Sequence, residues 1–121
     1  MKAKKKILIV DDEKELCLLM KTYLSKKNFE VYDTYSLNEG ILQMKLHKPD
    51  ILFLDNNLTD GMGWLHLNKF YEVNPATHIF LMSGFQPALP KISKKKKYKI
   101  LVKPISFNDL DNILDLNTGV P

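Results

Sequence analysis

Short, continuously apolar runs alternate along the chain with longer stretches in which apolar residues recur at helical spacing. Five of the short runs predict strands, over residues 6–10, 29–34, 51–54, 78–82 and 100–102. A continuous apolar run is typical of a strand covered on both faces, and strands that alternate with helices indicate a parallel sheet. The pattern therefore predicts an α/β fold with a five-stranded parallel sheet and five helical segments.

Helical spacing is clearest after the first strand, where apolar residues recur at i, i+3, i+4, i+7 and i+8. These residues are Leu16, Leu19, Met20, Tyr23 and Leu24. A serine followed three residues later by an acid is typical of a capping box, in which each of the two side chains accepts from the backbone amide of the other residue. This motif predicts helix starts at Ser36–Glu39 and Ser106–Asp109. The helix that begins at Ser36 is expected to run to about His47, and another helix carries Trp64 to Tyr71.

One helical segment, after the fourth strand, is irregular. Its apolar residues from Phe85 to Ile92 have helical spacing, but Pro87 and Pro90 interrupt it. Proline removes a backbone donor and clashes with the preceding turn. We therefore expect a short or displaced fourth helix.

Length and cysteine usage limit the architecture to one intracellular domain. A chain of 121 residues can bury a core without disulfides, so residues 1–121 are expected to form a single domain with a core of about residues 5–116. Cys17 is the only cysteine, and a reducing cytosol is the simplest compartment. The first apolar run is four residues long and meets three acids at once, which supports neither export nor membrane spanning.

The net charge of +4 is local rather than general. Eight of the 18 lysines lie in two groups, Lys2 with Lys4–Lys6 and Lys94–Lys97, and the other ten are outnumbered by 14 acids. The chain has no arginine, the residue best suited to base reading and bidentate phosphate contacts, so specific nucleic-acid binding is disfavoured. The second group is most simply a solvated face, with an acidic partner as the alternative.

Polar residues end four of the five predicted strands. They are Asp11 and Asp12 after the first, Asp55 after the third, Ser83 after the fourth and Lys103 after the fifth. Functional crevices in parallel α/β sheets lie at these carboxyl ends. Gathered carboxylates repel one another, so they imply a divalent cation, and hard oxygen ligands select Mg²⁺. With a lysine and a hydroxyl for an anion, and no glycine-rich loop for a nucleotide, the simplest chemistry is phosphoryl transfer onto a carboxylate.

These motifs resemble the receiver domain of bacterial response regulators over nearly the whole chain. The matching segments are Ile7–Glu13, Leu54–Asp55, Met82–Gly84 and Val102–Pro104. The resemblance implies a flavodoxin-like doubly wound sheet with strand order 2-1-3-4-5, which places the first and third strands side by side. It also implies a cytoplasmic signalling switch rather than an enzyme, one that promotes its own aspartyl phosphorylation and dephosphorylation.

The resemblance assigns roles to the residues at the strand ends. Asp55 would accept a phosphoryl group from a sensor histidine kinase or a histidine phosphotransfer protein. Asp12, Asp55 and the Asn57 carbonyl would bind Mg²⁺ (or Mn²⁺) directly, and Asp11 largely through water. Lys103 would pair with the phosphoryl group, Ser83 would swing towards it, and the Lys103–Pro104 bond is often cis in this family. The output partner is unknown, and a homodimer is one option.

The chain departs from the family pattern around the predicted switch. Ile100 stands where the family has an aromatic residue, with Tyr98 on the same side of the strand. Gly84 matches the family's small residue beside the hydroxyl. Phe85 either lies over the acyl phosphate and slows attacking water or packs outward. Thr59 replaces a common proline, so the loop after Asp55 should close but be looser.

Several alternatives remain at this stage. Asp12, taken alone, fits a helix N-cap with Glu15 as its partner. A pseudo-receiver that binds proteins without phosphate is the main functional alternative. A haloacid-dehalogenase-type phosphatase needs a second aspartate where Asn57 stands, and flavin binding is disfavoured by the acids at residues 11–13. Because no effector segment follows the last helix, we expect a stand-alone receiver, with a fragment of a longer protein as the alternative.

Overall fold

The computed structural model describes residues 3–84 and 98–116. The elements of this part are, in order, β1 (Lys6–Val10), α1 (Lys14–Lys26), β2 (Glu30–Thr34), α2 (Leu37–His47), β3 (Ile51–Asp55), β4 (Asn57–Leu58), β5 (Gly61–Met62), the 3₁₀ helix η1 (Gly63–His66), α3 (Leu67–Val73), β6 (His78–Ser83), β7 (Tyr98–Val102) and α4 (Phe107–Ile113). The predicted irregular helix over residues 85–92 lies outside the described residues.

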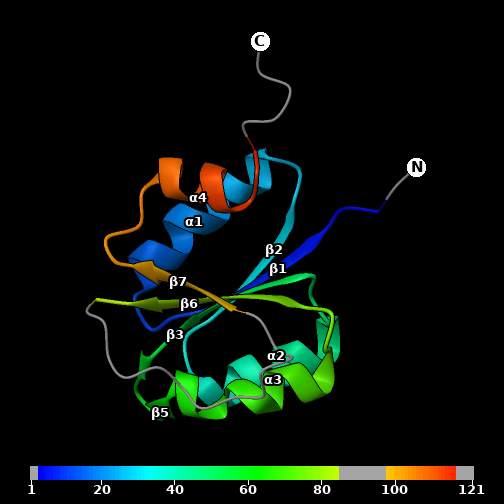
Figure 1. Cartoon of the computed structure of the whole chain (residues 1–121), viewed down its shortest axis with the longest axis vertical. Coiled ribbons are helices and arrows are strands. Elements are labelled where there is room, and N and C mark those ends of the chain that lie inside the picture. The colour runs from blue at the N-terminus through cyan, green and yellow to red at the C-terminus, as the bar shows by residue number, and fades with distance from the viewer. Residues whose placement is uncertain (1–2, 85–97, 117–121) are drawn as a thin grey trace.

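The five long strands form one parallel sheet in the order β2-β1-β3-β6-β7. Because β4 and β5 form a separate small hairpin, this order is the predicted 2-1-3-4-5. Figure 1 shows the sheet between two layers of helices, with α1 and α4 on one face and α2 and α3 on the other. The arrangement confirms the doubly wound sheet, and it brings the carboxyl ends of β1 and β3 side by side.

Two hydrophobic clusters hold these layers together. Alternate residues of β1 point to opposite faces, so Leu8 and Val10 pack in the cluster under α2 and α3, while Ile7 and Ile9 pack in the cluster under α1 and α4. β3 is buried along its whole length. The central strands are therefore fixed on both faces, and the residues at their ends have little freedom to shift.

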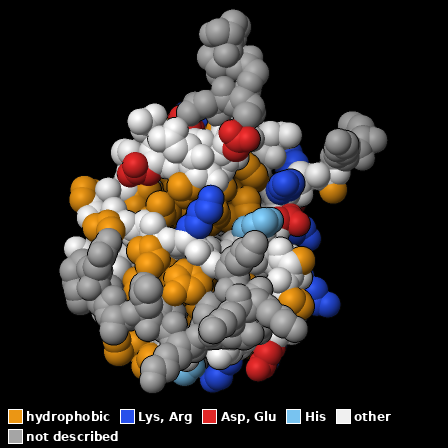
Figure 2. Space-filling view, in the orientation of Figure 1, with side chains coloured by type: hydrophobic (Ala, Val, Ile, Leu, Met, Phe, Trp, Pro, Cys, Tyr) orange, Lys and Arg blue, Asp and Glu red, His pale blue; other side chains and the backbone are white. Residues whose placement is uncertain are grey.

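The edge strand β7 is less buried than the centre. Tyr98 and Ile100 are half-buried and pack on the same cluster as α2 and α3, as alternation along the strand predicts. In the space-filling view, hydrophobic side chains gather on the face that carries β7 (Figure 2). The strand starts two residues earlier than predicted, because Tyr98 pairs in register with Ile79 of β6.

Helix α1 buries a slightly different stripe from the one predicted. Cys17, Met20 and Leu24 are buried, whereas Leu19 is half-exposed. The prediction for Leu19 was therefore wrong, because spacing alone fits two neighbouring stripes of one helix. The helix ends at Lys26, and Asn28 then takes a positive φ of 72° that leads the chain into β2.

The third predicted helix is two elements rather than one. Gly63–His66 forms the 3₁₀ helix η1, and only Leu67–Val73 is α-helical. Trp64 is buried in the core. Because Gly63 and Trp64 also contact the strand end of β3, the first turn has a tighter geometry than a regular α-helix.

The two predicted capping boxes have different outcomes. At α4 both halves are present, with Ser106 accepting from the Asp109 amide and Asp109 accepting from the Ser106 amide. At α2, Ser36 accepts from the Glu39 amide, as expected. Only this half of the box predicted at α2 is present. The amides of Leu37 and Asn38 donate to the carboxylate of Asp60, from the β4–β5 turn.

Replacing Asp60 with alanine is expected to lower the free energy of unfolding by about 1 kcal/mol at neutral pH, because two helix amides lose their acceptor. Hydrogen bonds from Asn38 and Leu37 lower the pKa of Asp60 below its ordinary value. The stabilisation is therefore present above the unfolded pKa of about 4 and is lost as the pH falls through the lower folded pKa.

Urea unfolding of both proteins at neutral and at acidic pH tests this expectation. Asp60→Asn is the matched control, because it keeps one neutral acceptor oxygen and should retain part of the effect at every pH. A difference between wild type and Asp60→Ala that does not shrink in acid would contradict a charged cap.

Candidate functional site

Three aspartates meet at the carboxyl ends of β1 and β3. Asp11, Asp12 and Asp55 each offer a carboxylate oxygen, and these oxygens lie within 4.8 Å of one another. Asp11 and Asp55 are buried, and Asp12 is half-buried. The neighbouring order of β1 and β3 brings the three residues together, as the sequence predicted.

Asp12 does not cap helix α1. The N-cap position is Glu13, whose side chain makes no capping hydrogen bond, and the Glu13 amide donates to Asp11 Oδ1 over 2.8 Å. The interpretation of Asp12 as a helix cap paired with Glu15 was therefore wrong. The turn between β1 and α1 is closed by Asp11 instead, which leaves the Asp12 carboxylate at the site.

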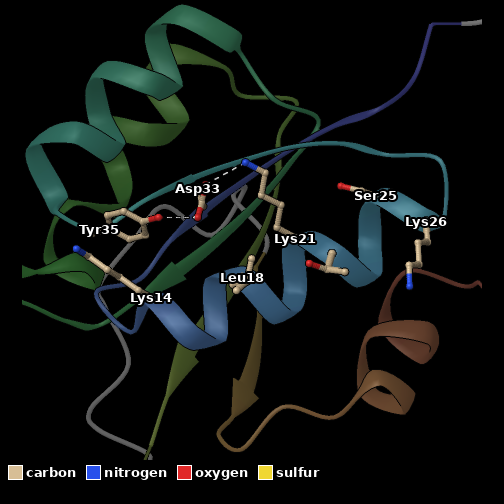
Figure 3. Close-up of a pocket in the computed structure, with 8 residues that line it drawn as sticks. Lys14, Leu18, Lys21, Ser25, Lys26, Asp33 and Tyr35 are labelled. Atoms are coloured by element: carbon tan, nitrogen blue, oxygen red, sulfur yellow. Dashed lines mark hydrogen bonds and ion pairs between the residues drawn. The ribbon is translucent and has the colours of Figure 1, made fainter.

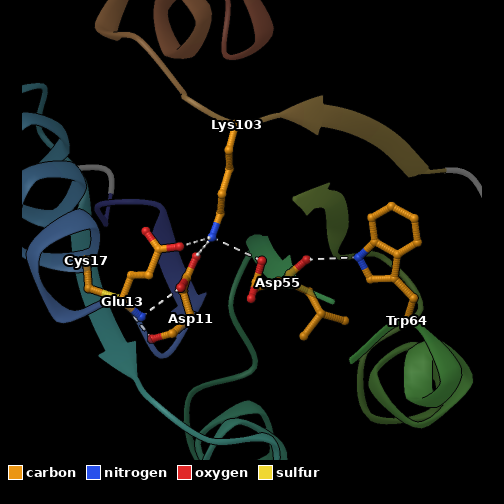
Figure 4. A network of polar contacts seen from close by, with 7 residues as sticks. Asp11, Glu13, Cys17, Asp55, Trp64 and Lys103 are labelled. Atoms are coloured by element: carbon orange, nitrogen blue, oxygen red, sulfur yellow. Dashed lines mark hydrogen bonds and ion pairs between the residues drawn. The ribbon is translucent and has the colours of Figure 1, made fainter. Parts of the chain in front are cut away.

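Lys103, after β7, reaches into this acidic cluster (Figure 4). Its Nζ lies 2.8 Å from Asp11 Oδ2, 3.1 Å from Asp55 Oδ1 and 3.1 Å from Glu13 Oε1. The Lys103–Pro104 peptide bond is cis, as the family resemblance implied. The contact between Lys103 and Glu13 was not predicted, because the sequence of three successive acids does not indicate which of their side chains face the lysine.

Burial and mutual repulsion set the electrostatics of the cluster. Burial, and then the charge of Asp11, raises the pKa of Asp55 to about 6. Burial also raises the pKa of Asp11, against the opposing effect of Lys103. Burial lowers the pKa of Lys103, but its carboxylate partners outweigh this effect, so the net shift is upward and the lysine stays charged.

The set of donors fits a hard divalent cation. One ammonium group faces Asp11, Glu13 and Asp55, so the cluster carries more negative than positive charge in a buried place. Three carboxylate oxygens within 4.8 Å of one another are hard ligands of the kind that Mg²⁺ prefers over softer-ligand metals. The arrangement can bind such a cation and place one carboxylate, that of Asp55, beside it.

Comparison with known proteins agrees with this geometry. The family model of the response regulator receiver domain matches residues 7–115. This chain belongs to that family. The receiver domain is 25% identical over 111 residues to the transcriptional regulatory protein ZraR of Salmonella typhimurium, covering 90% of the chain and 25% of ZraR. The chain thus spans about a quarter of the length of that relative.

Solved structures show the same fold. A CheY-like receiver domain from Methylobacillus flagellatus superposes with a TM-score of 0.80 at 24% identity, covering 93% of this chain and 98% of the other. A response regulator from Burkholderia pseudomallei with a phosphorylated aspartic acid, a calcium ion and citrate gives a TM-score of 0.78 at 17% identity, covering 94% and 68%. The flavodoxin-like fold is therefore shown, and response regulator receivers are signalling switches of two-component systems.

The remaining site residues predicted from the sequence have different outcomes. Ser83 is buried at the end of β6, in register with Val102 just before Lys103. Gly84 is exposed, and no described atom lies within 4 Å of where its Cβ would stand. Ile100 is half-buried, whereas Phe85 and Lys94–Lys97 lie outside the described residues. The structure thus places Ser83 beside the cluster and leaves the choice of orientation for Phe85 open.

The loop after Asp55 closes as a small hairpin. Asn57 of β4 pairs with Met62 of β5, and Leu58 pairs with Gly61. The expected closure of the loop is confirmed. Asn57 is exposed, two residues from Asp55, in the segment that the family resemblance assigned to metal binding.

A groove away from the acidic cluster runs along α1 and the end of β2 (Figure 3). It has a volume of about 690 Å³ and is lined in part by Lys14, Leu18, Lys21, Asp33 and Tyr35. Four of its polar residues contact one another, since Asp33 accepts from both Lys21 and Tyr35 and Lys14 lies over the Tyr35 ring. These contacts tie α1 to the edge strand. In the described part of the receiver domain, no helix has the length and hydropathy needed to cross a bilayer.

Proposed function

We propose that the protein is a phosphoacceptor that takes a phosphoryl group onto Asp55 and changes conformation in response. The observation that carries this proposal is the Asp55 carboxylate, 3% exposed, with Lys103 Nζ at 3.1 Å and two further aspartates around it. The phosphorylated aspartic acid in the Burkholderia structure supports it. We take residues 1–121 as a single receiver domain with a core of about residues 5–116.

Asp11, Asp12, Asp55 and the backbone carbonyl of Asn57 would hold Mg²⁺ (or Mn²⁺). When bound, the cation neutralises charge on the transferring phosphoryl oxygens. Burial, and then repulsion from Asp11, raises the pKa of Asp55 to about 6, so most of this carboxylate is already ionised and nucleophilic at neutral pH, and a bound cation would favour the ionised form further.

The transfer itself needs few protein groups. An Asp55 carboxylate oxygen attacks the phosphorus of a phosphohistidine, the new P–O bond forms as the P–N bond breaks, and the imidazole leaves with its electron pair and takes a proton from water. Lys103 remains charged because its pKa is raised, and it pairs with a phosphoryl oxygen while Asp11 and Glu13 hold its position. Hydrolysis by water restores the Asp55 carboxylate and releases phosphate.

The conformational response involves the end of β6. The Ser83 hydroxyl would donate to the phosphoryl group and draw Gly84 and the loop after it towards the site. Phe85 would control the access of water. Ile100 lacks a polar atom, so any movement of this side chain would be driven by packing rather than by a hydroxyl group.

Partners follow from this chemistry. The phosphodonor is a sensor histidine kinase or a histidine phosphotransfer protein in the cytoplasm, and the receiver acts as a switch that speeds its own phosphorylation and dephosphorylation rather than as an enzyme. The output is a downstream protein or a second copy of the chain, and specific nucleic-acid binding by this domain is not part of the proposal. Ile100 favours one alternative, a pseudo-receiver that binds its partner without phosphate.

Asp55→Asn is expected to abolish phosphorylation while leaving the fold intact, because it removes only the nucleophilic oxygen. The measurement is intact mass after incubation with acetyl phosphate, with and without Mg²⁺. Wild type should gain one phosphoryl group only with Mg²⁺, and the variant should gain none. Asp50→Asn, which alters an aspartate at the opposite end of β3, is the matched control and should behave as wild type. No gain by wild type under any condition would favour the pseudo-receiver.

A further inference from the structure

The strand end that carries Asp55 is clamped by the start of η1. Trp64 Nε1 donates to the Leu54 carbonyl over 3.3 Å, and the Gly63 amide donates to the Asn56 carbonyl over 2.9 Å. Between these two bonds, a Cβ built on Gly63 would lie 2.1 Å from the Asp55 carbonyl oxygen, so the two backbones are in close contact. Three successive residues, Leu54 to Asn56, are thus held by one dipeptide.

Asn56 closes the clamp through its side chain. It is only 2% exposed, and its Oδ1 accepts from the Trp64 amide over 3.2 Å. The backbone amide of Asn56 donates to the backbone carbonyl of Met82 over 3.2 Å, next to Ser83. Burying an amide side chain is unfavourable unless it is hydrogen-bonded, so this bond matters for the local structure. Asn56 is the residue between Asp55 and Asn57, both of which belong to the proposed site.

We propose that Asn56 and Trp64 are positioning residues that fix the Asp55 carboxylate and the Asn57 carbonyl for cation binding and phosphoryl transfer. The inference rests on the proposed function, because it assigns supporting residues to that same site. Groups that orient metal ligands typically change metal affinity or activity by about 10-fold to 100-fold when replaced. A displacement of about 1 Å at a reacting atom can cost about 100-fold in rate.

A purely structural interpretation is that Asn56 caps the first turn of η1, whose amides lack partners within the helix. The two interpretations differ in what a substitution changes. Loss of a cap lowers stability and leaves the folded site as it was. Loss of a positioning contact weakens Mg²⁺ binding even in the folded protein.

The test compares Asn56→Leu and Trp64→Phe with Asn74→Leu. The first removes the acceptor at nearly constant volume, and the second removes the indole donor and keeps an aromatic ring. Asn74 is the matched control, because its Oδ1 accepts from the Ala76 amide and its Nδ2 donates to the Pro49 carbonyl at the opposite end of the sheet. Each protein is measured for melting temperature, for Mg²⁺ affinity by calorimetry, and for the rate of mass gain from acetyl phosphate.

Asn56→Leu and Trp64→Phe are expected to weaken Mg²⁺ binding by about 10-fold and to slow phosphorylation at saturating Mg²⁺. Asn74→Leu should lower the melting temperature and leave Mg²⁺ affinity unchanged. If wild type binds Mg²⁺ and is phosphorylated but both site variants match its affinity and rate, the inference is wrong and the proposed function stands. If wild type itself gains no phosphoryl group, the proposed function fails and this inference fails with it.

Discussion

Gly63→Ala is expected to lower the free energy of unfolding by about 3 kcal/mol and to slow phosphorylation of Asp55 by about 100-fold. The added Cβ would lie 2.1 Å from the Asp55 carbonyl oxygen, and 3.1 Å from a Leu54 methyl group. The backbone of β3 is buried and paired on both sides, so the clash cannot be relieved by a side chain rotating away. Either β3 or the start of η1 must shift, and both carry the site.

Urea unfolding and the rate of mass gain from acetyl phosphate measure the two effects. Gly84→Ala is the matched control for stability, since no described atom lies within 4 Å of its Cβ position. It should unfold at the same urea concentration as wild type. A Gly63→Ala protein with the stability and phosphorylation rate of wild type would contradict the close contact between η1 and β3.

Lys103→Met is expected to destabilise the metal-free protein by about 3 kcal/mol, because it removes the cation that Asp11 and Asp55 face from inside the fold. The methionine keeps the unbranched chain as far as Cε and loses the ammonium group with its charge and hydrogen-bond donors. Mg²⁺ should then bind the variant more tightly than wild type and recover more of the lost stability, since the metal no longer competes with an ammonium group. Phosphorylation should nevertheless be slower, because the lysine also pairs with the phosphoryl group.

The matched control is Lys21→Met, which breaks an exposed ion pair with Asp33 and should cost about 0.5 kcal/mol with no dependence on Mg²⁺. Thermal unfolding of wild type and of both variants, each in a chelator and in Mg²⁺, gives the six values needed. Equal losses in the two variants, or a Lys103→Met protein that Mg²⁺ does not stabilise, would contradict the view of Lys103 as the counter-ion of a metal site.

The strands and the polar residues at their ends were predictable because the information is local. Runs such as Ile7–Val10 and Ile51–Leu54 are continuously apolar, so burial on both faces follows directly, and the residue after each run must lie at the edge of the sheet. No local feature of the sequence predicts that β1 and β3 are neighbours in the sheet. That expectation came from the family resemblance, and the register of β1 with β3 confirms it.

Contacts that depend on the relative placement of two elements could not be predicted. The pair Asp60–Gly61 indicates no more than a turn, and only the fold shows that this turn brings the Asp60 carboxylate to the start of α2. Glu13 and Asn56 are ordinary polar residues in the sequence, and their roles depend on where Lys103 and Trp64 arrive from other elements. Its place directly after a candidate nucleophile was the one signal that could have drawn attention to Asn56.

The most direct test of the central claim is to locate the phosphoryl group. Wild-type protein phosphorylated by acetyl phosphate in Mg²⁺ would be reduced with borohydride, which converts an aspartyl phosphate to homoserine, then digested and sequenced by tandem mass spectrometry. The account predicts homoserine at residue 55 alone and none in samples prepared in a chelator. Homoserine at another aspartate, or an unmodified residue 55 in protein that has gained mass, would contradict it.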